Sequence, residues 1–343
     1  MTALALIDTA HQLVGAGKGL LAMDESTGTC NRRFAALGIP QTEEARRAYR
    51  ELLVTTPRLG DSISGAILYD ETIRQRTKDG TPFLKVLTDA DIIPGIKVDT
   101  GAKDLAGRPG EKITEGLDGL RDRLKDYAGM GARFAKWRAV IALDDSIPSR
   151  GCIEANANAL ARYAALCQEA GVVPIVEPEV LMDGGHTLER SREATEETLH
   201  SVFSHLYTQN VMLEGVILKA NMVLPGLDCP NQESVDEVAA ATVKCLLRTV
   251  PAAVAGIAFL SGGQSAELAS ARLNAMNLIA QSSTSRLPWP LVFSFARAIQ
   301  QPALEVWRGD AARVVAAQDA LEHRAHCNRA ALLGEYSAAM ERA

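Results

Sequence analysis

The sequence predicts an α/β fold, a single closed (β/α)8 barrel of the TIM-barrel type. Eight short apolar runs bounded by Gly, Pro or Asp recur about every 30 to 45 residues along the 343-residue chain. The stretches between them are longer, charged and rich in Ala and Leu, and strands that alternate with helices form parallel β-α units. The competing architecture is an open doubly wound sheet. The first run ends in "AMDESTGT", without the Gly-rich phosphate turn that such sheets carry there.

The predicted strands follow from these runs in chain order: 19–24, 64–70, 92–99, 132–141, 172–180, 214–221, 255–263 and 290–297. Helical spacing of apolar residues is clear at 155–170 ("ANANALARYAALCQEA") and at 233–248 ("ESVDEVAAATVKCLLR"). Residues 1–17 and 299–343 are expected to form flanking helices. Because no linker or repeat interrupts the chain, residues 1–343 are predicted to form one domain.

Composition excludes several classes of protein. The formal net charge of −6 argues against nucleic acid as a partner, and no stretch approaches the roughly 20 apolar residues that cross a bilayer. The N-terminus lacks a basic leader, which makes it a poor signal peptide. The six cysteines lack CxxC spacing and are typical of free thiols in a reducing cytosol. We therefore expect a cytoplasmic protein.

Ionisable side chains stand at the ends of most predicted strands, where barrel enzymes carry their catalytic groups. An outward orientation or a structural ion pair would explain any single one of these residues. Neither explains well why such residues occur on six or seven of the eight strands. Residues two apart on a strand, such as Lys136 and Arg138, share one face. The ionisable set comprises Asp24, Lys97, Asp99, Lys136, Arg138, Glu177, Glu179, Lys219 and Arg297, and the seventh run ends in Ser261-Gly262-Gly263.

Lys219 ends the apolar run "LEGVILKANMV", where a lysine is costly to bury. Burial and a nearby Lys136 both favour the neutral amine, which is the nucleophilic form. The chemistry open to such an amine is Schiff-base formation with a substrate carbonyl. Dehydration of the carbinolamine needs an acid, and Glu177 or Glu179 could supply it. The mixture of charges is expected to be cationic overall where phosphate-sized groups bind.

Two segments are suited to binding phosphate. "LSGGQS" (260–265) places Ser261, Gly262 and Gly263 between a strand and a helix, where backbone N–H groups can surround an anion, and Arg297 ends the next strand. On the other side, Ser26, Thr29 and Arg33 follow the first strand and Lys97 lies on the third. Two separated anion sites that flank a nucleophilic lysine indicate a substrate with a phosphate at each end.

Seven motifs together resemble the class I fructose-1,6-bisphosphate aldolases, over residues 15 to 336. They are "GKGLLAMDESTGT", "GIKVDTG", "FAKWRAV", "VPIVEPEV", "LEGVILKANMV", "GIAFLSGGQS" and "FSFARA". The resemblance implies reversible cleavage of fructose 1,6-bisphosphate to dihydroxyacetone phosphate and glyceraldehyde 3-phosphate. It implies no metal or other cofactor, because the protonated imine is itself the electron sink. It also implies a homotetramer.

The resemblance assigns a role to each residue that matches a motif. Lys219 corresponds to the Schiff-base lysine, Glu177 to the acid and base of dehydration, and Asp24 to the group that takes the C4 hydroxyl proton. Lys136 resembles the cation beside the imine, and Glu179 supports the charge pattern. The C1-phosphate residues are expected to be Ser261, Gly262, Gly263, Ser294 and Arg297. The C6-phosphate and hydroxyl contacts are expected to be Ser26, Thr29, Arg33, Lys97 and Arg138.

Three alternatives stay open from the sequence. A related Schiff-base aldolase could act on fructose 1-phosphate or sedoheptulose 1,7-bisphosphate. A non-catalytic scaffold of the same fold would be expected to lack some of Asp24, Lys136, Glu177 and Lys219, and all four are present. A metal-dependent aldolase needs clustered histidines, but the six histidines fall outside the strand ends.

Overall fold

Eight parallel strands close into a barrel in the computed structural model, which describes residues 2–282 and 287–342. The strand order around the barrel is β1-β10-β9-β8-β7-β6-β3-β2. Every one of the eight predicted strands is present, so the predicted fold class is confirmed. The barrel strands are β1 (Gly19–Ala22), β2 (Ile63–Leu68), β3 (Ile93–Lys97), β6 (Phe134–Ile141), β7 (Val173–Val180), β8 (Ile217–Ala220), β9 (Gly256–Phe259) and β10 (Leu291–Phe295).

The observed strands are shorter than most of the predicted ones, and their ends carry the functional loops. Residues 260–263, predicted as the end of a strand, form a loop after β9, and residues 213–215 form a 3-10 turn before β8. Asp24 and Asp99 likewise lie just beyond β1 and β3. The apolar runs therefore located the strands correctly but extended them into loop residues that face the mouth of the barrel.

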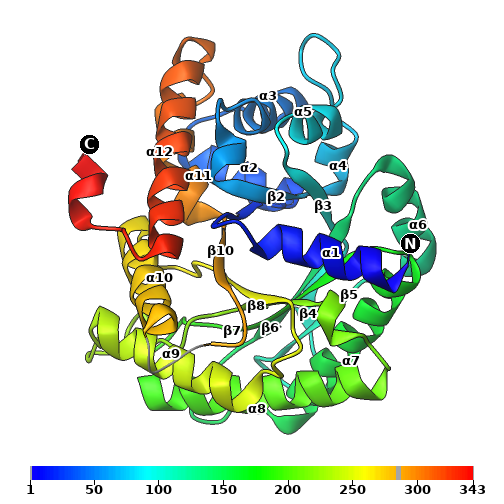
Figure 1. Cartoon of the computed structure of the whole chain (residues 1–343), viewed down its shortest axis with the longest axis vertical. Helices are drawn as coiled ribbons and strands as arrows, with labels where there is room; N and C mark the ends of the chain where they lie inside the picture. The colour runs from blue at the N-terminus through cyan, green and yellow to red at the C-terminus, as the bar shows by residue number, and fades with distance from the viewer. Residues whose placement is uncertain (1, 283–286, 343) are drawn as a thin grey trace.

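Helices cover the outside of the barrel (Figure 1). The two helices predicted from apolar spacing correspond to α7 and α9. The helices are α1 (Ala3–Val14), α2 (Thr27–Ala36), α3 (Glu43–Val54), α4 (Asp70–Ile73), α5 (Phe83–Asp89), α6 (Leu120–Met130), α7 (Arg150–Glu169), α8 (Leu188–Thr208), α9 (Val235–Thr249), α10 (Ala266–Gln281), α11 (Arg297–Trp307) and α12 (Val314–Leu333). The 3-10 turns are η1 (Leu59–Asp61), η2 (Leu213–Gly215), η3 (Ala311–Arg313) and η4 (Ala338–Arg342). None of the helices in the described part of the chain is long and apolar enough to cross a membrane.

Helix α1 forms most of the N-terminal flanking segment, and α11, η3, α12 and η4 form most of residues 299–342; residues 1 and 343 lie outside the described residues. Helix α1 closes the end of the barrel where the strands begin. The Ser64 hydroxyl at the start of β2 donates to the Leu13 carbonyl at 2.6 Å, and Gly256 at the start of β9 lies against Val14. The opposite end, where the strands finish, is left open to the loops.

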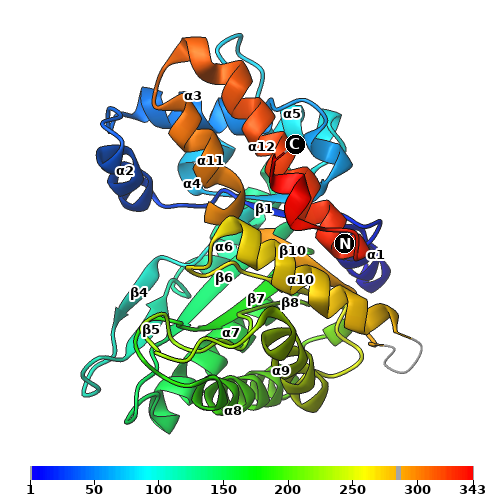
Figure 2. The same cartoon turned by 90° about the vertical axis from the view of Figure 1, so that its left-hand side faces the viewer.

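A two-stranded antiparallel sheet, β4 (Gly101–Asp104) and β5 (Lys112–Glu115), follows β3 and was not predicted. Its sequence is polar, and most of its side chains are exposed or partly exposed, so it carries no apolar run that would signal a strand. Figure 2 shows this hairpin and α2 at one end of the barrel, with α1 at the other. The hairpin therefore lies beside the open mouth.

The barrel interior near α1 is filled by large side chains that fit against glycines. Phe134 on β6 occupies the space next to Gly95 on β3, where a Cβ atom would lie 2.3 Å from the ring. A residue with any side chain at position 95 would displace Phe134, because overpacking a close-packed core strains its rotamers and backbone. This apolar layer leaves the interior nearer the mouth to polar side chains.

Candidate active site

A cavity of about 510 Å³ opens at the carboxyl ends of the strands. All of the residues predicted from the sequence to act in catalysis or substrate binding line it, except Gly263. Gly263 instead faces Leu227 and Met182 on the outer side of its loop. The lining predicted residues are Asp24, Ser26, Thr29, Arg33, Lys97, Lys136, Arg138, Glu177, Glu179, Lys219, Ser261, Gly262, Ser294 and Arg297.

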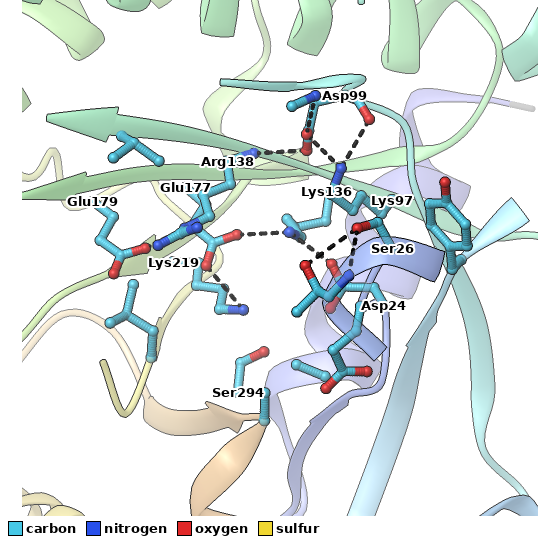
Figure 3. Close-up of a pocket in the computed structure, with 18 of the residues that line it drawn as sticks. Asp24, Ser26, Lys97, Asp99, Lys136, Arg138, Glu177, Glu179, Lys219 and Ser294 are labelled. Carbon is cyan, nitrogen blue, oxygen red and sulfur yellow. Dashed lines mark hydrogen bonds and ion pairs between the residues drawn. The ribbon is translucent and has the colours of Figure 1, made fainter. Parts of the chain in front are cut away.

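Four buried side chains form a row of alternating charge across the floor of this cavity (Figure 3). Lys136 Nζ lies 2.7 Å from Asp24 Oδ2 and 3.1 Å from Glu177 Oε2, and Lys219 Nζ lies 3.0 Å from Glu177 Oε1. Lys136, Glu177 and Lys219 are each 3% exposed, so these charges are stabilised by one another rather than by water. The row comes from β6, β7, β8 and the segment just after β1, which the closed barrel brings together.

The electrostatics of the row keep both of its carboxyl groups ionised. Burial by itself would raise the pKa of Asp24, but the positive charges of Lys136, Lys219 and Lys97 outweigh burial and lower it. Glu177 behaves in the same way: burial acts to raise its pKa, and Lys136, Lys219 and Arg138 lower it. The pKa of Lys136 is raised, because Asp24 and Glu177 overcome the effect of burial.

Lys219 is in direct contact with a carboxylate. Glu177 lies between the two lysines, with one oxygen 3.1 Å from Lys136 Nζ and the other 3.0 Å from Lys219 Nζ. The geometry therefore places a proton acceptor directly on the amine. Sequence spacing could not reveal this contact, because it is made between neighbouring strands.

The remaining cations on the strands also have carboxylate partners. Arg138 Nε donates to Glu179, and Lys97 Nζ lies 2.5 Å from Asp99 Oδ1. Asp99 also accepts from the backbone N–H of Arg138 and of Gly101, at 3.2 and 3.1 Å. Asp99 therefore fixes Lys97 relative to β6 and to the start of the β4–β5 hairpin.

The cavity is less cationic than the sequence led us to expect. Six cationic and five anionic side chains line it, so the surplus is a single positive charge. Five of the six cations lie within ion-pairing distance of a carboxylate. Among the described residues, Arg297 is the lining cation without such a partner. The uncompensated charge is therefore concentrated at one side of the cavity.

That side is the loop 260–264 between β9 and α10. Arg297 Nη2 donates to the Gly262 carbonyl at 3.2 Å, and Gly262 has a φ of +57°, a conformation that glycine adopts without strain. Ser294 on β10 lines the same cavity, and its buried hydroxyl has no hydrogen-bond partner within the described residues. A cation, an unpaired hydroxyl and a glycine loop before a helix are suited to binding an anion.

A second set of polar groups lies at the N-terminus of α2. Ser26 caps this helix, with its Oγ accepting from the Thr29 backbone N–H at 3.3 Å. Arg33 lies 2.6 Å from Glu25 Oε1, and the buried Arg50 approaches Glu25 Oε2 at 2.8 Å. Burial opposes ionisation of Glu25, yet Arg50 and Arg33 lower its pKa.

The sequence reasoning missed Glu25, Tyr69 and the hairpin residues 100–102, all of which line the cavity. Glu25 directly follows Asp24 in the "AMDES" motif, and Tyr69 directly follows β2, so strand-end position was a signal that could have identified both. Arg50 does not line the cavity and lies on α3, and no sequence pattern links it to Glu25.

Within the described residues, one trio of metal-ligating side chains lies close together, His323, Cys327 and Glu341. It lies on α12 and η4, and none of its members lines the cavity. Glu341 is already bound by Arg324 and by the Tyr336 hydroxyl. None of the six histidines is among the residues that line the cavity.

Comparison with known proteins was made for the whole chain. A family model described as fructose-bisphosphate aldolase class-I matches residues 5–343. The chain is 59% identical over 332 residues to a probable fructose-bisphosphate aldolase class 1 of Xanthomonas campestris pv. campestris, covering 96% of this chain and 98% of the relative. It is 49% identical over 335 residues to the fructose-bisphosphate aldolase of Dictyostelium discoideum, covering 97% and 92%.

A solved structure gives the same match. The fold superimposes with a TM-score of 0.95 on fructose-bisphosphate aldolase from Plasmodium falciparum, solved in complex with TRAP and a small-molecule inhibitor. The two chains are 45% identical, and the match covers 98% of this chain and 96% of the other.

Proposed function

The chain belongs to the class I fructose-bisphosphate aldolases, and from this premise we propose that Lys219 forms the Schiff base through which it cleaves fructose 1,6-bisphosphate. The observation that carries the assignment is the buried row Asp24, Lys136, Glu177 and Lys219, in which the Lys219 amine lies 3.0 Å from a carboxylate oxygen of Glu177. The products of cleavage are dihydroxyacetone phosphate and glyceraldehyde 3-phosphate.

Glu177 serves the Schiff-base steps as both base and acid. It takes a proton from the Lys219 ammonium, and the neutral amine then adds to the C2 carbonyl of the open-chain substrate. The same proton, now on Glu177, passes to the C2 hydroxyl of the carbinolamine, which leaves as water and forms a protonated imine. The position of Glu177, with one oxygen on Lys219 and the other on Lys136, suits this shuttle.

Asp24 serves the cleavage step. Its lowered pKa keeps it ionised, so it can accept the proton of the C4 hydroxyl as the C3–C4 bond breaks. The bonding electrons move to C3 and into the protonated imine, which becomes an enamine, and glyceraldehyde 3-phosphate leaves. Protonation at C3 and addition of water to the imine release dihydroxyacetone phosphate and restore Lys219. Because the imine accepts the electrons, the proposed reaction needs no metal.

Lys136 stays charged between the two carboxylates and stabilises negative charge that develops beside the imine. The C1 phosphate is assigned to Ser261, Gly262, Ser294 and Arg297, where the uncompensated cation lies. The C6 phosphate and hydroxyls are assigned to residues of β3, β6 and the segment after β1, namely Ser26, Thr29, Arg33, Lys97 and Arg138. Glu179 acts on Arg138, with which it is paired.

We also propose three properties that rest on membership of the family. Residues 1–343 act as one barrel domain, the chain assembles as a homotetramer, and it works in the cytoplasm. Relatives with similar sequences include cytosolic and chloroplastic proteins of Arabidopsis thaliana, so the compartment varies within the family.

Trapping tests the assignment of Lys219. Incubation with dihydroxyacetone phosphate and borohydride should reduce the imine to a stable amine, and mass mapping should find the adduct on the peptide that contains Lys219. Lys219→Arg keeps a cation beside Glu177 and should abolish both the adduct and cleavage while the protein stays folded. Lys103, exposed on β4, provides the matched control, because Lys103→Arg should change neither. An adduct on another lysine, or turnover by Lys219→Arg near that of the wild type, would show that the assignment is wrong.

A further inference from the structure

A buried arginine lies behind the glycine loop, outside the cavity. Arg272 is in the second turn of α10 and is 4% exposed. Its Nη1 donates to Gln264 Oε1 at 2.8 Å, and its Nε is buried without a hydrogen-bond partner in the described structure. Arginine is rarely buried unless it is paired, because removing its charge from water costs free energy. Arg272 therefore needs an explanation.

No carboxylate compensates this charge within ion-pairing distance in the described ranges 2–282 and 287–342. Burial lowers the pKa of Arg272, and the negative charge of Glu233 only partly offsets this. The contrast with Arg324 is informative. That arginine is 3% exposed and also contacts α10, donating to the Ala266 carbonyl at 3.1 Å, but Glu341 neutralises it. Arg272, by contrast, has no carboxylate in contact within the described residues, and the more distant Glu233 offsets its charge only in part.

The contacts of Arg272 lead directly to the loop. The Gln264 side chain that it holds donates from Nε2 to the Ser261 carbonyl at 3.0 Å, and the Gln264 backbone N–H reaches the same carbonyl at 3.2 Å. On the outer side, Met182 packs against Gly262 and Leu227 against Gly263. The loop is therefore held from behind by Arg272 through Gln264, and its cavity side carries Arg297.

We propose that Arg272 is a positioning residue for the phosphate of dihydroxyacetone phosphate: it fixes the loop 261–264 through Gln264 and adds a positive charge behind it. The bound dianion adds negative charge to the partial compensation that Glu233 provides. Arg297 acts on the phosphate from the cavity side, while Arg272 acts through the loop without touching substrate. This inference rests on the proposed assignment of the C1 phosphate to this loop.

The lack of a contacting carboxylate among the described residues has a consequence that a purely structural arginine would not have. Removing a paired buried charge destabilises a protein, whereas removing an unpaired one relieves a cost. Arg272→Met should therefore leave the Tm of the substrate-free enzyme unchanged or raise it, while weakening binding of dihydroxyacetone phosphate. Arg324→Met, the matched control, should lower the Tm and leave the KM values unchanged, because it removes the partner of Glu341.

The test is steady-state condensation with purified full-length enzyme, measuring KM separately for dihydroxyacetone phosphate and glyceraldehyde 3-phosphate. Arg272→Met should raise the KM for dihydroxyacetone phosphate about fivefold or more, with kcat and the other KM within about twofold of the wild type. Arg272→Lys keeps the charge and should recover part of the loss. If Arg272→Met does not fold, Gln264→Leu breaks the same chain of contacts and should raise the same KM selectively.

The outcomes separate the inference from the assignment on which it rests. Arg297→Ala should raise the KM for dihydroxyacetone phosphate whether or not Arg272 contributes. If Arg297→Ala leaves that KM unchanged, the phosphate assignment itself is wrong. If Arg297→Ala raises it but Arg272→Met does not, or Arg272→Met raises both KM values equally or lowers the Tm alone, Arg272 is a structural residue and the inference is overturned.

Discussion

Replacing Lys136 by methionine should reverse the pH dependence of stability at the active site. Lys136 lies between two buried carboxylates, but Glu177 keeps a second cation, Lys219, at 3.0 Å. Asp24 has Lys136 at 2.7 Å as its ion-pair partner in the described structure. The substitution therefore leaves Asp24 as the buried charge without a partner.

The magnitude follows from that distance. At an effective dielectric constant of about 20, unit charges 2.7 Å apart attract by about 6 kcal/mol. The substitution also removes the free-energy cost of taking the Lys136 charge out of water, which offsets part of this loss. Breaking a buried pair by removing one partner typically destabilises by about 3–5 kcal/mol. For a chain of this size we expect the Tm near neutral pH to fall by about 4–7 °C.

The sign depends on pH. In the wild type the lowered pKa of Asp24 contributes stability above its unfolded pKa of about 3.9, and that stability is lost as the pH falls further. Without Lys136, burial is opposed only by Lys219 and Lys97, neither of which is within ion-pairing distance of Asp24 in the described structure, and we expect the pKa of Asp24 to rise above 3.9. Asp24 then contributes favourably to folding stability only at low pH, and this contribution is lost as the pH rises through the raised pKa. The gap in stability between variant and wild type should widen from pH 5 to pH 8.

Scanning calorimetry at pH 5 and pH 8 measures this gap directly, with Lys103→Met, an exposed lysine on β4, as the matched control. The control should match the wild type at both pH values. An equal fall in Tm at pH 5 and pH 8, or no fall at either, would refute the reasoning, because the loss would then not arise from the Asp24 charge.

Two further predictions concern groups around the cavity and in the core. Glu25→Gln removes the carboxylate that pairs with the buried Arg50, and it should lower the free energy of unfolding, measured with denaturant, by about 3–5 kcal/mol. The control is Glu44→Gln, which breaks a contact with Arg47 of the same 2.8 Å length at an exposed site and should lower the free energy of unfolding by less than about 1 kcal/mol. Equal losses would contradict the role assigned to burial. All six cysteines are buried, so a thiol reagent should modify them only on unfolding, and rapid labelling of the native enzyme would contradict the fold.

The sequence predicted the barrel because its strands are buried on both faces and read as apolar runs. It also predicted most of the cavity, because polar residues that end buried strands can only lie at the mouth. Lys136 and Glu177, which lie within β6 and β7, were identifiable as charged residues in otherwise apolar strands. The β4–β5 hairpin was not, because short exposed strands carry no apolar pattern.

Pairing between charges was beyond sequence reasoning for a different reason. A count of strand-end charges predicted a cationic cavity, but most cations proved to be neutralised by carboxylates on neighbouring strands or loops. Whether two such side chains meet depends on barrel register and rotamer, which spacing along one strand does not determine. Arg50 illustrates the limit most clearly, since it contacts Glu25 from α3, a helix that no motif connects to the cavity.

This pairing makes the two proposed phosphate sites electrostatically unequal. On the α2 side, Arg33, Lys97 and Arg138 each already contact a carboxylate, so a phosphate there must share or displace that partner. On the loop side, neither Arg297 nor the buried Arg272 has a carboxylate within ion-pairing distance in the described part of the chain. A dianion therefore gains more uncompensated attraction at the loop. On the proposed orientation, the phosphate next to the Schiff-base carbon anchors the substrate, and this end also remains bound through the imine after glyceraldehyde 3-phosphate has left.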